Sequence, residues 1–212
     1  NTGGAFVADT TVFDEQLTGW WWDLELADLD NDGDLDVIAG NIGLNNKFHP
    51  SAEKPLEIYM GDLDATGTND IVLAKHKAPG STECVPVRGR ECSSEQMPFI
   101  KEKFKTYKAF SEADLTTLYG DEQLRKAVHL SARDFRSMVW RNNGGNFTPV
   151  PLPSIAQVAP LRGCVVADVN AASYPDDIES RHLLHIGATR AAHQLWVIST
   201  GQVSPLVPKW LL

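Results

Sequence analysis

The chain has 212 residues with 28 acidic and 19 basic side chains, which gives a formal net charge of −9. Nucleic-acid binding depends on neutralising phosphates with lysine and arginine, so this acidic balance argues against a nucleic-acid partner. The sequence has no run of eighteen or more apolar residues, and it therefore predicts no membrane-spanning helix.

The first predicted structure is a pair of strands around an acidic loop. Residues 22–27 alternate between apolar and polar side chains, as in a half-buried strand. Residues 37–39 form a short apolar run, as in a buried strand. The loop between them carries five aspartates at alternate positions: Asp28, Asp30, Asp32, Asp34 and Asp36. Carboxylates this close together repel one another unless a cation neutralises them.

Calcium fits this loop because Ca²⁺ takes about six to eight oxygen ligands from carboxylates, carbonyls and water. We expect side-chain ligation by Asp28, Asp30, Asp32 and Asp36, and a backbone carbonyl ligand from Asp34. Gly33 stands where the loop must turn sharply, which favours a residue without a Cβ atom. The spacing begins like an EF-hand, but Ala39 occupies the position of its last acidic ligand. This loop is therefore expected to join strand to strand, and a solvated acidic turn is the alternative interpretation.

The motif recurs in a second loop, where Asp62, Asp64, Thr66 and Asp70 take the ligand positions before another apolar run. Thr66 replaces a charged ligand by a neutral one, so we expect the second site to bind Ca²⁺ more weakly than the first. A third copy begins at Asp168 but has lost the glycine and has gained extra residues. Repetition of this kind is typical of radial or stacked architectures.

The Asp-x-Asp-x-Asp-Gly-x-x-Asp pattern followed by a strand resembles the calcium loop of FG-GAP or VCBS repeats, which form the blades of integrin-α-like β-propellers. The resemblance covers about residues 3–177. It implies a mainly β fold, as a partial or open β-propeller of about three blades with an inserted helical lobe. Closed propellers have roughly four to eight blades. We therefore expect a fragment of a longer protein, a ring completed by partners, or an open arc.

Three segments follow from this interpretation. Residues 1–77 hold two calcium-loop repeats, residues 78–137 a cysteine-bracketed loop and a helical insertion, and residues 138–212 a third, degenerate repeat with a divergent tail.

In the insertion, the aromatic residues between Phe99 and Phe110 recur at helical spacing. Residues 111–114 have the pattern of a capping box that opens a second helix, which Gly120 ends. Residues 121–130 predict a third helical segment. The segment 92–100 resembles the helical excursion of UnbV-like secreted proteins.

The last part of the chain returns to a β pattern. Residues 138–141 predict a strand, and the sequence Asn-Asn-Gly-Gly at residues 142–145 predicts a hairpin turn. This turn is similar to the one that introduces a blade in the propeller family. Beyond about Asp177 the sequence departs from the family, although residues 195–198 have the composition of one more strand.

Cysteine content and calcium chemistry indicate the setting of the protein. Three cysteines allow one disulfide, and Cys84 and Cys92, which bracket a short loop, are the expected pair, leaving Cys164 free. Calcium loops of this type fill where calcium is plentiful, typically outside the cytosol. Both features favour a secreted, periplasmic or cell-surface protein, whereas a cytosolic location would leave the cysteines as free thiols.

No catalytic signature is recognisable, because the sequence lacks both Gly-x-Ser-x-Gly and His-Glu-x-x-His and its six histidines are scattered. Trp20, Trp21 and Trp22 are more informative. On a strand, Trp20 and Trp22 share one face and Trp21 lies on the other, so at least one indole is expected near the surface, where it would stack on a sugar ring. Packing between blades is the alternative role for these side chains.

Two functions follow from these features. The first is a calcium-stabilised module that binds a protein or carbohydrate ligand, as the resemblance implies. The second is a calcium-dependent hydrolase, a lactonase or esterase in which bound Ca²⁺ polarises the carbonyl of a small ester or lactone. Loops of this type usually lie on a propeller rim and are closed by protein ligands, which favours the binding module. We expect unpaired sheet edges either to support self-association or to be covered by the helical lobe and the C-terminal tail.

Overall fold

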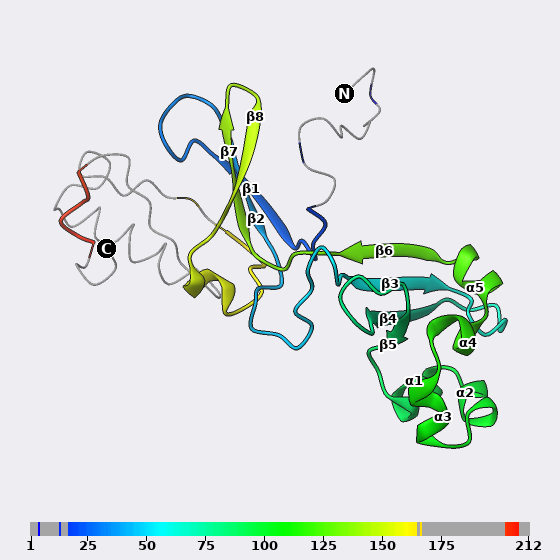
Figure 1. The fold of residues 1–212 in the computed structure, drawn as a ribbon. Helices are drawn as coiled ribbons and strands as arrows, with labels where there is room; N and C mark the ends of the chain where they lie inside the picture. The colour runs from blue at the N-terminus through cyan, green and yellow to red at the C-terminus, as the bar shows by residue number, and fades with distance from the viewer. Residues whose placement is uncertain (1–3, 5–12, 14–16, 165, 167–201, 208–212) are drawn as a thin grey trace. The chain divides into compact units, whose positions relative to one another are not determined.

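The computed structural model describes residues 4, 13, 17–164, 166 and 202–207. The chain separates into two compact units. The first combines residues 1–15, 20–47 and 135–212, and the second combines residues 16–19 and 48–134. The predicted mainly β architecture is confirmed, because the described strands form two four-stranded sheets, one in each unit (Figure 1).

The first unit holds the antiparallel sheet β1-β2-β7-β8. Its elements are β1 (Asp23–Ala27), β2 (Asp36–Gly40), β7 (Met138–Asn143), β8 (Asn146–Pro151) and the 3-10 helix η1 (Ser154–Gln157). Ala27 on β1 stands opposite Asp36 on β2, so the first acidic loop closes a β-hairpin, as predicted. β7 and β8 form the second predicted hairpin, with Gly144 and Gly145 at positive φ in its turn.

The centre of this sheet joins strands that are far apart in the sequence. β2 pairs with β7, with Val37 opposite Trp140. The buried side chains of this region include Ile38, Phe135, Met138 and Leu161. At Gly40 a Cβ atom would lie 2.1 Å from the Leu161 carbonyl oxygen, so only glycine lets the chain after η1 pass this close to β2.

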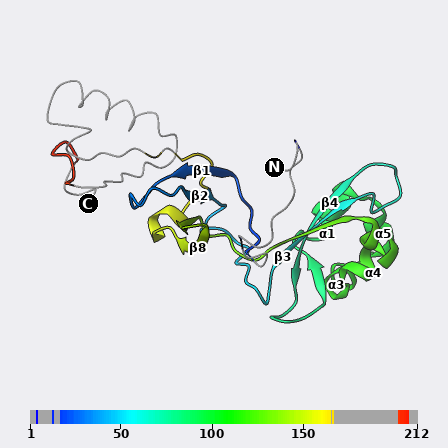
Figure 2. The same ribbon diagram turned by 90° about the horizontal axis from the view of Figure 1, so that it is seen from above.

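The second unit holds the antiparallel sheet β5-β4-β3-β6 and a group of short helices. Its strands are β3 (Leu56–Gly61), β4 (Asp70–His76), β5 (Cys84–Pro86) and β6 (Val128–Ala132). Its helices are α1 (Arg90–Gln96), α2 (Phe99–Lys103), α3 (Tyr107–Glu112), α4 (Leu115–Tyr119) and α5 (Asp121–Lys126). The helices lie together on one side of this sheet (Figure 2).

The two faces of the second sheet differ in what covers them. Val72 and Ala74 of β4 belong to one hydrophobic cluster with helical residues such as Ile100 and Leu118. The opposite face carries Met60, Ile71, Val128 and Leu130, which are 40–59% exposed. Packing of one face against helices explains why such short helices form at all, since isolated helices of this length are unstable in water.

The predicted helical lobe is present, but two of its boundaries are wrong. The cap of α4 is Asp114, whose carboxylate accepts a hydrogen bond from the Thr117 backbone nitrogen at 2.7 Å, whereas Ser111 lies inside α3. Gly120 ends α4, as predicted. The last helix stops at Lys126, because residues 128–132 pair with β3 as strand β6 instead of continuing the helix.

The predicted disulfide between Cys84 and Cys92 is not formed, and both residues are free thiols, as is Cys164. Cys84 is half-buried in β5, where it stands opposite His76 of β4. Cys92 is exposed on α1, which begins six residues after Cys84. Burial, with a smaller effect from Glu57, raises the pKa of the Cys84 thiol to about 11, so this side chain stays protonated and behaves as an apolar one.

Several predictions concern residues that the structure does not describe. The third calcium-loop copy from Asp168 and the strand at 195–198 both lie outside the described residues. The longest helix in the described part of the chain, α1, has seven residues, and no helix there is long and apolar enough to span a membrane.

Candidate metal centre

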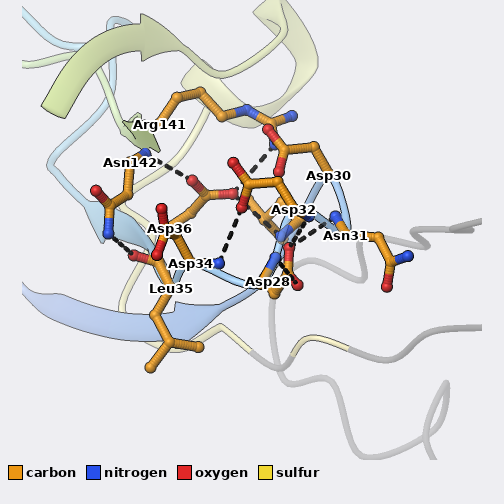
Figure 3. Close-up of polar contacts among 11 residues, drawn as sticks. Asp28, Asp30, Asn31, Asp32, Asp34, Leu35, Asp36, Arg141 and Asn142 are labelled. Atoms are coloured by element: carbon orange, nitrogen blue, oxygen red, sulfur yellow. Dashed lines mark hydrogen bonds and ion pairs between the residues drawn. The ribbon is translucent and has the colours of Figure 1, made fainter. Parts of the chain in front are cut away.

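The first acidic loop is a tight turn held by its own carboxylates (Figure 3). The Asp28 carboxylate accepts hydrogen bonds from the backbone nitrogens of Asn31 at 2.6 Å, Asp32 at 3.2 Å and Gly33 at 3.0 Å. Asn31 and Gly33 have positive φ angles of 63° and 94°, which asparagine and glycine tolerate best. These bonds wrap the backbone around Asp28 and direct neighbouring carboxylates toward one another.

The second loop repeats this conformation 34 residues later in the sequence. The Asp62 carboxylate accepts bonds from the backbone nitrogens of Thr66 and Gly67, both at 2.9 Å. Ala65 and Gly67 have φ angles of 60° and 86°. The loop joins β3 to β4 as the first joins β1 to β2. Two loops with matching positive-φ positions and two corresponding bonds to their first aspartate indicate that the acidic motif itself largely fixes the shape.

Each loop brings three carboxylates to within 4.8 Å of one another. In the first loop they belong to Asp28, Asp30 and Asp32, and in the second to Asp62, Asp64 and Asp70. The Thr66 hydroxyl donates to the Asp64 carboxylate of the second group at 2.7 Å. Two like charges about 4 Å apart repel by roughly 1 kcal/mol in water and about 4 kcal/mol near a protein surface. A hard divalent cation with oxygen ligands fits this donor set and would remove the repulsion.

Asp36 closes the first loop from a buried position. It is 0% exposed and accepts bonds from the backbone nitrogens of Leu29 at 3.0 Å and Asn142 at 2.8 Å. The Arg141 guanidinium on β7 donates to Asp36 at 3.1 Å and also reaches Asp30 at 3.3 Å. Arg141 therefore connects two predicted calcium ligands in the described structure (Figure 3).

The β7–β8 hairpin makes further contacts with the first loop. The Gly144 backbone nitrogen donates to the Asp34 carboxylate at 2.9 Å, and the Asn142 side chain donates to the Leu35 carbonyl at 3.1 Å. The Asp34 side chain is thus used by the hairpin, which is compatible with the prediction that only its backbone carbonyl serves as a ligand. Sequence reasoning missed Arg141 and Asn142, because a separation of about one hundred residues leaves no local signal.

Asp70 is the corresponding residue of the second loop, and its partners differ in charge. It is 5% exposed and accepts bonds from the Leu63 backbone nitrogen at 3.2 Å and the Gln96 side-chain amide at 3.1 Å. Gln96 on α1 is neutral, whereas Arg141 is a cation. The two loops therefore share a backbone but differ in whether a protein cation already lies beside the acids.

The three tryptophans have different surroundings. The Trp21 ring packs edge-on against Trp140 with centroids 5.2 Å apart, and Trp20 packs against Phe135 at 6.5 Å. Trp22 is 43% exposed, with the Arg162 guanidinium 4.4 Å above its ring. Only Trp22 of the three is largely exposed for stacking on a ligand. The other two rings pack against aromatic side chains of the same unit.

A second buried acid, Glu57, lies in the second unit and was not singled out by the sequence. It is 6% exposed and bonds the Nε2 atoms of His76 at 2.9 Å and His129 at 2.8 Å, one with each carboxylate oxygen. Its partners are 19 and 72 residues away. Among the described residues, these two histidines bind Glu57 and neither contacts an aspartate loop.

Comparison with known proteins gives one short match. The family profile of the UvrD-like helicase C-terminal domain matches residues 162–198, most of which lie outside the described residues. The match covers less than a fifth of the chain and includes neither aspartate loop, so it does not assign the chain to that family. Comparisons with curated proteins and with solved structures found no significant match.

Proposed function

We propose that this chain is a calcium-binding module of the FG-GAP or VCBS type, in which each aspartate loop holds one Ca²⁺ and stiffens the hairpin that carries it. The observation that carries the proposal is the repetition described above. Two loops at the ends of two hairpins share left-handed turn positions, two corresponding backbone bonds to their first aspartate, and three converging carboxylates.

The first site would use Asp28, Asp30, Asp32 and Asp36 with the Asp34 carbonyl, and the second Asp62, Asp64, Thr66 and Asp70. Bound Ca²⁺ supplies positive charge that cancels the repulsion within each loop. The protein contributes the pre-formed turn and the buried closing acid. Loops of this type usually close their ion with protein ligands, which supports a structural site and a binding module.

The ligand that we propose for the module is a protein or a carbohydrate, met outside the cytosol where calcium is plentiful. Trp22 is the contact residue that we favour for it, because its indole is exposed and lies next to the cationic Arg162. Aromatic faces next to hydrogen-bond donors suit sugar rings and the side chains of partner proteins alike.

Calcium is expected to raise the melting temperature of the protein. Metal that binds only the folded state stabilises it by mass action, by about 2.7 kcal/mol at a hundredfold excess over the dissociation constant. Differential scanning calorimetry in millimolar Ca²⁺ and in EGTA measures the effect. Exchange of Asp28 for Asn should remove the share of the calcium-dependent rise in melting temperature that comes from the first loop. Asp62→Asn should remove the share that comes from the second loop. A melting temperature that is the same in Ca²⁺ and EGTA would contradict the proposal.

Exchange of Arg141 for Gln is expected to tighten calcium binding to the first loop. The guanidinium contacts Asp30 and Asp36, so it repels an incoming cation and competes for its ligands. Relief of about 1.4 kcal/mol or more corresponds to at least a tenfold gain in affinity. Isothermal titration calorimetry with Ca²⁺ measures the change.

The matched control for this experiment is Gln96→Ala, which removes the neutral side-chain partner of the second loop and should bring no such gain. Weaker calcium binding in the Arg141→Gln protein would instead mean that the guanidinium holds Asp30 and Asp36 in place for the metal.

A further inference from the structure

A small pocket lies in the second unit between the strands and two of the helices. It opens beside β4 and β5, and its lining includes Val72, Pro86, Ser93, Gln96, Met97 and Tyr119. About 10 Å³ is left in which the centre of a water-sized molecule can lie. A cavity needs roughly 10–15 Å³ by this measure to hold one water molecule. The pocket is therefore too small for an organic ligand and matches a single water.

The Tyr119 hydroxyl is the polar group that this pocket leaves unsatisfied. Tyr119 is 5% exposed, and its hydroxyl oxygen is buried without a hydrogen-bond partner in the described structure. Burial raises the pKa of this phenol to about 12, so the group is a neutral donor throughout the physiological range. A buried hydroxyl without a partner is destabilising, and native structures usually satisfy it with protein or water.

Two neighbouring polar side chains, Ser93 and Gln96, are the groups that could help to satisfy the Tyr119 hydroxyl. The Ser93 hydroxyl lies near the Tyr119 hydroxyl and partly offsets the effect of burial on the pKa of this phenol, but the two groups do not meet the geometry of a hydrogen bond in the described structure. Ser93 donates to the Arg88 carbonyl at 3.4 Å, which leaves its oxygen lone pairs as acceptors. The Gln96 amide nitrogen donates to Asp70 at 3.1 Å. An amide group oriented in this way keeps its oxygen as an acceptor, and Gln96 lines the same pocket as Tyr119.

We propose that this pocket is a binding site for one ordered water molecule, which accepts a hydrogen bond from the Tyr119 hydroxyl and donates one to the Gln96 side-chain oxygen. An ordered water in a protein typically makes two to four such bonds, and these two reach that range. The water links α4 to α1. Through the bond from Gln96 to Asp70, it also connects the helical lobe to the base of the second aspartate loop.

The first test is the sign of a stability change in Tyr119→Phe, measured by thermal denaturation in EGTA. If water satisfies the hydroxyl, its loss removes a hydrogen bond and lowers the melting temperature by a few degrees. If the hydroxyl is unsatisfied, removing it raises the melting temperature, and that result would overturn the proposal.

A double-mutant cycle then separates water from a direct side-chain partner. The effect of Tyr119→Phe should shrink to less than half in a Gln96→Leu background, because both residues bind the same water. Ser93→Ala is the control, and a larger coupling to Ser93 than to Gln96 would show a direct bond and overturn the proposal. A high-resolution crystal structure of the unaltered protein gives a readout that does not depend on variants. Solvent density within hydrogen-bonding distance of both groups is expected, and an empty pocket would refute the site.

Discussion

Exchange of Asp36 for Ala should lower the free energy of unfolding of the first unit by about 3 kcal/mol in EGTA. Asp36 is fully buried and accepts bonds from two backbone nitrogens and from Arg141. The alanine variant leaves the nitrogens of Leu29 and Asn142 without an acceptor, and each buried unsatisfied donor costs about 1–3 kcal/mol. Loss of the guanidinium partner adds to this, although Arg141 keeps its contact with Asp30.

Urea denaturation followed by tryptophan fluorescence measures this change. The four tryptophans that the structure describes, Trp20, Trp21, Trp22 and Trp140, all belong to the first unit, so their signal reports on that unit. The matched control is Asp32→Ala in the same loop, where the carboxylate is exposed and bonds only the Asp34 backbone nitrogen. The control should change stability by less than about 1 kcal/mol. Equal effects in the two variants would contradict the role of Asp36 as the buried acceptor that holds the loop without metal.

The second unit should lose stability as the pH rises through the pKa of His76. Both ring nitrogens of His76 face acceptors, the Ser81 carbonyl and the Glu57 carboxylate, so both carry protons in the ion pair. Partial burial opposes protonation, but these two hydrogen bonds outweigh it and raise the pKa of His76 above 6.5. The stabilisation is therefore complete below the unfolded-state pKa near 6.5 and is lost above it, as the pH rises through the raised folded-state pKa.

Other charged or titratable groups lie near the His76–Glu57 pair and affect how stability changes with pH. Lys54 opposes protonation of His76, and Cys84 lies opposite it on β5. His129 shares Glu57 and stacks on Tyr59 with ring centroids 4.3 Å apart. The thiol and the phenol both have raised pKa values, so they remain neutral over the range in which His76 titrates.

Glu57→Gln should flatten this pH dependence and lower stability at pH 6 by about 3 kcal/mol, since breaking a buried ion pair is strongly destabilising. Hydrogen exchange of the β3 and β6 amides, between pH 6 and pH 8, reports on the second unit after correction for intrinsic rates. Glu83→Gln is the control, because its ion pair with Lys77 is exposed to solvent and contributes little to stability. If the wild-type second unit became more stable as the pH rises, His76 could not be the protonated partner of Glu57 in the folded state.

The features that sequence reasoning predicted correctly are those held by local contacts. The two acidic loops are shaped by bonds that span no more than seven residues. The β7–β8 turn is fixed by its paired glycines. Such signals lie within one stretch of sequence, so spacing and residue type were sufficient for them.

The missed features depend on contacts between distant segments or on competition between equivalent local signals. The bond from Arg141 to Asp36 spans 105 residues, and the bond from His129 to Glu57 spans 72. Ser111 and Asp114 are both good capping residues three positions apart, and only packing of α4 decides between them. Val128 continues the helical spacing of apolar residues, but it pairs with β3 as part of strand β6. Strand pairing here outweighs the local helix propensity.

The pairing of β2 with β7 has a consequence for synthesis. Residues 41–134, which include the described sheet and helices of the second unit, leave the ribosome after β2 but before β7. The second unit therefore has all its strands available while the first still lacks half of its sheet. Domains generally fold as units during synthesis, so the inserted unit can mature first. Its completion shortens the effective loop that β7 must close to reach β2 and reduces the entropy lost in that step.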